Sequence, residues 1–125
     1  MKFTIDKKEL FVVLKMEGEK LNTLNAPDLK SELLVLNAEG FRNIILDLSA
    51  ITFIDSSGLS AILVANRLCK DSHGTLVVTG LHPNVIKLVK ISQLDSILTI
   101  LPTNQEASDY IKMEELTREI TGEQE

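Results

Sequence analysis

Two adjacent serines, Ser56 and Ser57, lie where the sequence changes from a strand pattern to a helix pattern, and Asp55 precedes them. Apolar residues dominate positions 44–54, whereas from Leu59 onward they recur at helical spacing. The start of a helix presents unpaired backbone N–H groups and the positive end of the helix dipole, so it accommodates an anion. This position makes the serine pair a candidate surface switch.

We expect Ser56 to be the N-cap of this helix, with its oxygen directed at the first-turn N–H groups. A phosphate on Ser56 would add about −1.5 to −2 charges beside Asp55. The helix end tolerates this charge, but a partner docked over the same spot would meet the new charge and lose contact area. Gly58 has no side chain and is expected to leave room for close approach by a kinase. Ser57 is the second choice for the modified residue.

The same helix is expected to present one face to a sheet and the other to solvent. On a helical wheel with Leu59 at zero, the inward residues are Leu59, Ile62, Leu63, Ala65, Asn66 and Cys69. The outward residues are Ser57, Ser60, Val64, Arg67 and, at the margin, Ala61 and Leu68. Because Val64 and Leu68 are apolar, the outward face could be a partner surface, or these two could be ordinary scattered surface residues.

Two alternatives to a switch follow from the same residues. The serines could be helix caps without further function. The chain could also be an enzyme, but it has no Gly-x-Ser-x-Gly motif, no GxGxxG and no Walker pattern, and the spacing of His73 and His82 suggests no catalytic partner. We therefore expect no catalytic residue, no cofactor and no metal site.

The composition excludes several classes of partner. The formal net charge of −5 is carried by residues 106–125, which hold seven acids and two bases. No basic cluster exists elsewhere, so we expect neither direct nucleic-acid binding nor binding to an anionic membrane surface. No apolar run approaches the ~18 residues of a membrane span, and residues 1–6 do not resemble a signal peptide. The single cysteine, Cys69, is expected to be buried, which fits a reducing cytoplasm.

Alternating patterns along the chain predict the elements that position the serines. Strands are expected at 3–7, 10–16, 43–48, 75–79 and 97–101, and helices at 25–39, from the serines to His73, at 83–91 and at 104–120. Asn25 is expected to cap the first helix and Gly40 to end it. In the last helix, Ala107, Tyr110, Met113, Leu116 and Ile120 follow helical spacing opposite an acidic face.

This order of elements predicts an α/β fold with a small mixed, largely parallel sheet, an opening β-hairpin and four helices. Asp47 interrupts the strand before the serines and is expected to cap or pair locally. We expect one domain over residues 1–120 and a frayed acidic tail over 121–125.

The run from Ile45 to Ser60, with Asp55-Ser56-Ser57-Gly58 near its end, resembles the signature of the STAS domain. More narrowly, it resembles the bacterial anti-sigma factor antagonists. The order of elements agrees with that family along nearly the whole chain. The resemblance extends to three other segments, Gly18-Glu19, Gly74 and Ile91–Leu94.

The resemblance implies a regulator without enzymatic activity. In that family, an anti-sigma factor that is also a serine kinase of the histidine-kinase-like ATPase type phosphorylates one serine of the Asp-Ser-Ser-Gly motif, which matches Ser56. The unmodified protein binds the anti-sigma factor and frees a sigma factor. Phosphorylation ends this binding, and a PP2C-type phosphatase restores it. Asp55 matches the acidic residue beside the phosphorylated serine.

One loop departs from the family pattern. The segment Gly18-Glu19-Lys20-Leu21-Asn22 stands where the family commonly has Gly-Glu-Leu-Asp, so it has one extra residue and Asn22 in place of Asp. That loop lies near the phosphorylated serine in the family, so Asn22 is expected to affect partner docking. The resemblance also allows another role, as a STAS scaffold or docking subunit of a signalling or transporter complex.

Overall fold

The chain opens with an antiparallel hairpin, as predicted. The computed structural model describes residues 2–122, and in it β1 (Phe3–Lys7) pairs with β2 (Val12–Met16). Phe3 lies opposite Met16, and Lys7 lies opposite Val12. Alternate residues of β2 are fully buried, because one face of the hairpin packs on the main hydrophobic core.

The other strands of the main sheet are parallel to β2. They are β4 (Ile44–Asp47), β6 (Leu76–Thr79) and β7 (Thr99–Leu101), and the order across the sheet is β1-β2-β4-β6-β7. Every residue of β4 and β6 is buried, which explains their continuous apolar sequence. The predicted mixed, largely parallel sheet is confirmed.

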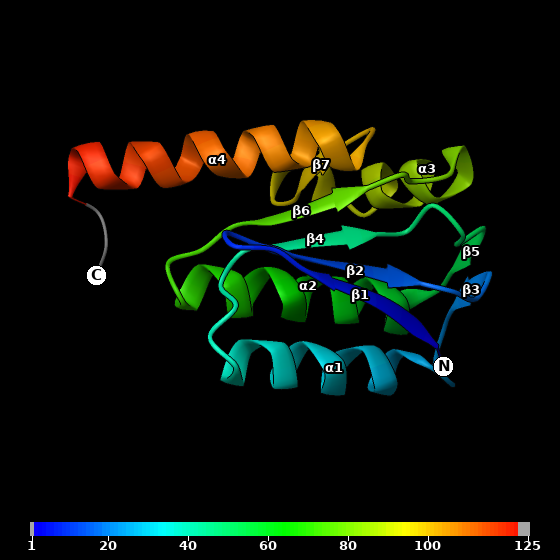
Figure 1. Cartoon of the computed structure of the whole chain (residues 1–125). Helices are drawn as coiled ribbons and strands as arrows, with labels where there is room; N and C mark the ends of the chain where they lie inside the picture. Colours follow the sequence, from blue (N-terminus) through cyan, green and yellow to red (C-terminus); the bar gives the residue numbers. More distant parts are fainter. Residues whose placement is uncertain (1, 123–125) are drawn as a thin grey trace.

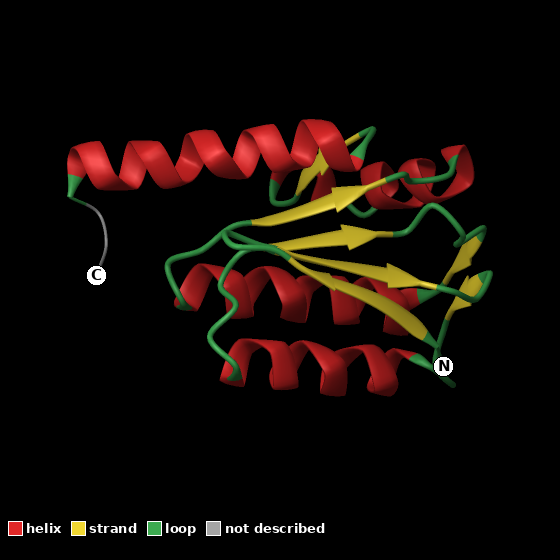
Figure 2. Ribbon diagram, in the orientation of Figure 1, coloured by secondary structure: helices red, strands yellow, loops and turns green. Residues whose placement is uncertain are grey.

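Helices cover both faces of the sheet. Figure 1 shows α1 (Ala26–Ala38) and α2 (Ser56–Asp71) on one face and α4 (Asn104–Thr121) on the other. Figure 2 shows the same three layers by type of structure. The shorter helix α3 (Pro83–Ile91) follows β6 in the chain and adds Val85 and Val89 to the larger core.

Two short elements were not predicted. The segment expected to be a loop contains β3 (Lys20–Leu21), which pairs in parallel with β5 (Phe53–Ile54) in a separate two-stranded sheet. A single turn of 3-10 helix, η1 (Leu94–Ser96), lies between α3 and β7. Two-residue strands have too few positions to show an alternating pattern, so periodicity cannot reveal them.

The first helix begins differently from the prediction. Asn25 stands at the N-cap position, but its side chain makes no capping hydrogen bond. Instead its Oδ1 accepts from the backbone N–H of Asn22 at 2.8 Å, and its Nδ2 donates to the carbonyl of Lys20 at 2.7 Å. Gly40, at φ +99°, ends the helix as predicted, and the Phe41 N–H then bonds back to Leu36.

The start of α4 is tied to the ends of two strands. Asp47 is buried at the end of β4 and accepts from the Ser49 N–H at 2.9 Å and from the Asn104 side chain at 2.9 Å. Asn104 in turn accepts from the Thr79 hydroxyl at 2.5 Å. Burial would raise the pKa of Asp47, but these hydrogen bonds and the charge of Lys15 lower it overall. Asp47 therefore caps its own turn and also holds α4.

The apolar spacing in α4 does not mark its inner face. Only Ala107 of the five spaced apolar residues is buried, together with Ile111, whereas Met113, Leu116 and Ile120 are exposed. Figure 1 shows the reason: the second half of α4 extends past the sheet. Thr121 of the predicted frayed tail is still helical, and residues 123–125 lie outside the described part of the chain.

Polar contacts hold this second half of α4. Glu115 accepts from Arg42 at 2.6 Å, from Asn43 at 2.7 Å and from Arg118 at 2.8 Å. Arg118 also donates to the Thr75 hydroxyl. Burial would raise the pKa of Glu115, but the Asn43 hydrogen bond and the two arginines lower it overall. The carboxylate thus joins α4 to the segments that precede β4 and β6.

We predict that Glu115→Gln lowers the free energy of unfolding at pH 7 by about 1–3 kcal/mol, because charge-assisted hydrogen bonds are lost. A lowered pKa in the folded state stabilises the protein above the ordinary value of 4.5, and this contribution is lost as the pH falls through the lowered pKa. The difference between wild type and E115Q in urea denaturation should therefore shrink below pH 4.5. Glu9→Gln, at an exposed position outside α4, is the matched control. Equal stability of both variants would contradict the prediction.

Candidate functional site at the start of helix α2

Asp55, rather than Ser56, is the N-cap of α2. Its backbone is extended, and its Oδ1 accepts from the Gly58 N–H at 3.0 Å. Ser56 is the first helical residue, so the prediction that it caps the helix is wrong. Its side chain is exposed, and within the described residues no hydrogen bond holds its hydroxyl. The cap carboxylate thus leaves Ser56 accessible at the positive end of the helix.

Ser57 is held more tightly than Ser56. It is half-buried, and its hydroxyl lies 3.1 Å from the hydroxyl of Thr23. The Thr23 N–H also donates to Asp55 Oδ2 at 3.1 Å, and the Thr23 hydroxyl lies 3.3 Å from the same oxygen. The two serines therefore differ: Ser57 belongs to a network between the loop after β3 and the start of α2, and Ser56 lies outside it.

This network lowers the pKa of Asp55. The largest contribution is the hydrogen bond from the Gly58 N–H, and bonds from Thr23 and the Ser57 N–H outweigh the opposing effect of desolvation. Asp55 therefore carries a full negative charge at neutral pH. Any charge added to Ser56 would stand next to it.

Asn22 shapes the loop rather than touching the serines. Its Oδ1 accepts from the Leu24 N–H at 3.0 Å, and its carbonyl accepts from the Ala26 N–H at 2.8 Å. Its own N–H bonds to the Asn25 side chain. These bonds turn the chain into α1 and hold Thr23 against Asp55. Asn22 thus bears on the site through the position of Thr23.

Gly58 is buried, so the expectation that it leaves room for a kinase is wrong. A Cβ on Gly58 would lie 2.5 Å from the Leu21 carbonyl oxygen and 2.6 Å from Ile54 Cγ1. The missing side chain therefore lets α2 lie directly against Leu21 of β3 and Ile54 of β5, which are both buried. Glycine is required here because α2 begins directly against the two-stranded sheet.

Comparison with known proteins places this geometry in a family. The STAS domain family model matches residues 2–107. The chain belongs to the STAS domain family, among the anti-sigma factor antagonists. BtrV of Bordetella bronchiseptica, which is named as an anti-sigma factor antagonist, is 30% identical over 112 residues, covering 90% of this chain and 96% of BtrV.

Solved structures have the same fold. The structure of an anti-sigma factor antagonist from Thermotoga maritima, TM1081, is 26% identical with a TM-score of 0.82, covering 88% of this chain and 94% of TM1081. The Bacillus cell fate determinant SpoIIAA in its phosphorylated form is 21% identical with a TM-score of 0.68, covering 88% of this chain and 99% of SpoIIAA. The predicted fold of the STAS domain is confirmed.

The outward face of α2 in this STAS domain is narrower than predicted. Ser60 and Arg67 are exposed and Val64 is half-buried, but Ala61 is fully buried and Leu68 packs on the core. The helix packs against α1 as well as against the sheet. Two packing partners bury a larger part of its circumference than the sheet alone would. Leu63 and Asn66, predicted to face inward, are only half-buried at the edge of this arc.

Two exposed apolar residues near Ser56 were missed. Leu24 is 88% exposed in the loop after β3, and Phe53 is 50% exposed in β5. The register of the small sheet places Phe53 beside Lys20, four residues before Leu24. Leu24 and Phe53 therefore belong to the two chain segments that Asp55 joins through its bond to Thr23. A leucine within the polar run Asn22-Thr23-Leu24-Asn25 was a signal that sequence reasoning could have used. These two residues extend the site beyond α2.

Within residues 2–122 no cluster of His, Cys, Asp or Glu could hold a metal ion, and no helix is long and apolar enough to cross a membrane. Cys69 is buried as predicted, and burial raises its pKa to about 12. His73, with φ +61°, occupies the turn after α2, and His82 is the N-cap residue of α3 with an extended backbone.

We predict that Gly58→Ala destabilises the STAS domain by about 1–3 kcal/mol, because the added methyl overlaps a backbone carbonyl and a packed isoleucine. Chemical denaturation followed by circular dichroism measures the effect. Gly18→Ala is the control, because a Cβ at Gly18 would meet no atom within 4 Å. A Gly58→Ala protein as stable as the control would show that α2 can move away from β3 without cost.

Proposed function

We propose that this STAS domain binds an anti-sigma factor that is also a serine kinase of the histidine-kinase-like ATPase type, and so frees a sigma factor. Phosphorylation of Ser56 ends the binding, and a PP2C-type phosphatase restores it. The observation that carries the proposal is the exposed Ser56 hydroxyl at the start of α2, which no neighbour holds within the described residues, whereas Ser57 bonds to Thr23.

The fold supports modification without unfolding. A phosphate on Ser56 would stand at the N-terminus of a 16-residue helix, where the helix dipole favours negative charge. The first-turn N–H of Gly58 is already satisfied by Asp55, and this bond does not involve Ser56. The added phosphate therefore leaves the internal hydrogen bonds of the site in place.

A docked partner would not tolerate the same charge. Leu24 follows Thr23 and Phe53 lies two residues before Asp55, so both offer apolar contact area next to the Asp55 network. Ser60, Val64 and Arg67 continue the surface along α2. A phosphate would add about −1.5 to −2 charges beside the ionised Asp55, within the contact area. Each ~1.4 kcal/mol of this repulsion and desolvation weakens binding about tenfold.

The relatives support this assignment. BtrV is named as an anti-sigma factor antagonist, and SpoIIAA, which shares the fold, is known in a phosphorylated form. We further propose that the protein acts by binding alone, without catalytic activity, and in the cytoplasm, where a kinase has ATP. A membrane-docking subunit would instead co-purify with membranes whether or not Ser56 is phosphorylated.

We predict that the cognate kinase and ATP modify Ser56, detected by mass spectrometry of the intact and digested protein. Ser56→Asp should weaken the complex with the anti-sigma factor about tenfold or more, measured by isothermal titration calorimetry. Ser56→Ala should bind like wild type and resist the effect of ATP, and Ser57→Ala should remain sensitive to ATP. Modification at neither serine, or equal binding by S56D and S56A, would refute the switch.

We predict that Leu24→Ser and Phe53→Ser each weaken the same complex about tenfold, because exposed apolar side chains at the centre of an interface contribute most of its energy. The matched control is Leu34→Ser, on α1, where the leucine is 55% exposed and lies outside the site. All three variants should unfold at similar temperatures. If the control weakens binding as much as L24S and F53S do, the interface lies elsewhere.

A further inference from the structure

The second half of α4 carries an apolar stripe that nothing in the described chain covers. Met113, Leu116 and Ile120 are 61%, 49% and 76% exposed. Their spacing of three and four residues places them on one face, opposite the inner face that contains Ile111 and Glu115. The STAS match ends at residue 107, so the stripe lies beyond the segment that defines the family.

Charges flank this stripe in a particular pattern. Lys112 and Glu119 are seven residues apart, so they occupy the same side of the helix, next to Met113 and Ile120 respectively. Both are exposed, and within residues 2–122 neither forms an ion pair. On the other flank the two positions next to the stripe are Tyr110 and Thr117, which have no charge, and Glu114 lies farther from the stripe and is half-buried. Next to the stripe, one flank therefore has a positive and a negative position, and the other has neither.

We propose that a second copy of this chain covers the stripe, with the two α4 helices antiparallel. An antiparallel helix pair brings the same flank of both helices together. A two-fold axis between residues 115 and 116 then places each Lys112 opposite Glu119 of the second copy, so the pattern is complementary to itself. A parallel pair would place Lys112 opposite the uncharged Thr117, which gains nothing. Charge complementarity thus selects the antiparallel dimer.

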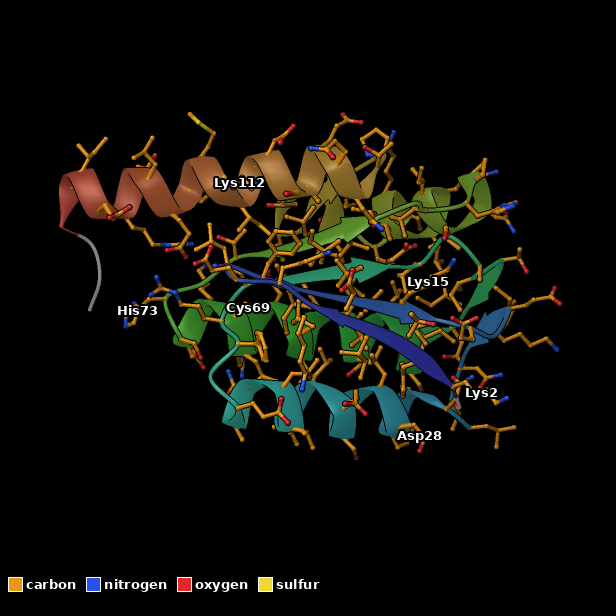
Figure 3. All side chains as sticks on the ribbon, viewed as in Figure 1. Lys2, Lys15, Asp28, Cys69, His73 and Lys112 are labelled. Carbon is orange, nitrogen blue, oxygen red and sulfur yellow. The ribbon has the colours of Figure 1, made fainter. Side chains whose placement is uncertain are left out.

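The dimer is compatible with the proposed switch but does not depend on it. Figure 1 shows the second half of α4 projecting beyond one end of the sheet, whereas α2 begins at the other end, beside β5. Figure 3 shows Lys112 on α4 and Cys69 on α2, on opposite sides of the sheet. Pairing through α4 therefore leaves both copies of Ser56 accessible. Three apolar side chains bury a small area, so the dimer is weak and reversible.

The test is sedimentation equilibrium of the full chain over a wide range of protein concentration. Wild type should associate reversibly to a dimer. Lys112→Glu and Glu119→Lys should each weaken the dimer about tenfold, because both symmetric contacts become repulsive. The double variant K112E/E119K should recover the wild-type dissociation constant. An equimolar mixture of the two single variants should form a heterodimer, since one then carries two acids and the other two lysines.

Controls separate pairing through α4 from other association. Met113→Ser and Ile120→Ser should abolish the dimer, whereas Leu34→Ser, at a 55% exposed position on α1, should not change it. Thermal unfolding of each variant checks that the fold is intact. A wild-type protein that stays monomeric overturns the proposal. So does a dimer that both single charge reversals leave unchanged, or one that the double variant fails to restore.

Discussion

The hydrogen bonds of Asp55 determine the geometry of the site. One carboxylate oxygen caps α2 through Gly58, and the other holds Thr23, 32 residues earlier in the chain. A single side chain therefore fixes both the start of a helix and the loop that leads into another helix. Ser56 is accessible because Asp55, and not Ser56, supplies the cap. Loss of this carboxylate would release two elements at once.

The sequence predicted most of the architecture, because long elements carry enough residues for their period to be read. The parallel strands, the four helices and the burial of Cys69 follow from such patterns. The helical wheel of α2 was wrong at Ala61, since a wheel assumes one buried face and α2 has two neighbours, the sheet and α1. The spacing in α4 failed as a guide to burial for a related reason. Periodic apolar residues show that a helix has an apolar face, but they do not show whether another part of the chain covers that face.

The site itself was found only in part. The motif located Asp55, Ser56 and Ser57, yet the contact with Thr23 joins residues far apart in sequence, and no local pattern encodes it. The role of Gly58 was misjudged for the same reason, because Leu21 and Ile54 fill the space beside it. Such contacts depend on the small β3–β5 sheet, whose strands are too short to be recognised.

Ser56 lies outside the internal hydrogen-bond network, and this has a consequence for how fast the protein can be modified. A residue that took part in the folded hydrogen-bond network would react with the kinase only in the small fraction of molecules in which those bonds are broken, and this would lower the rate of modification. Ser56 takes no part in the bonds that Asp55, Thr23 and Ser57 make with one another. In the proposed cycle, the rates of the kinase and the phosphatase alone would then set how fast the protein changes state, and the fold would add no delay.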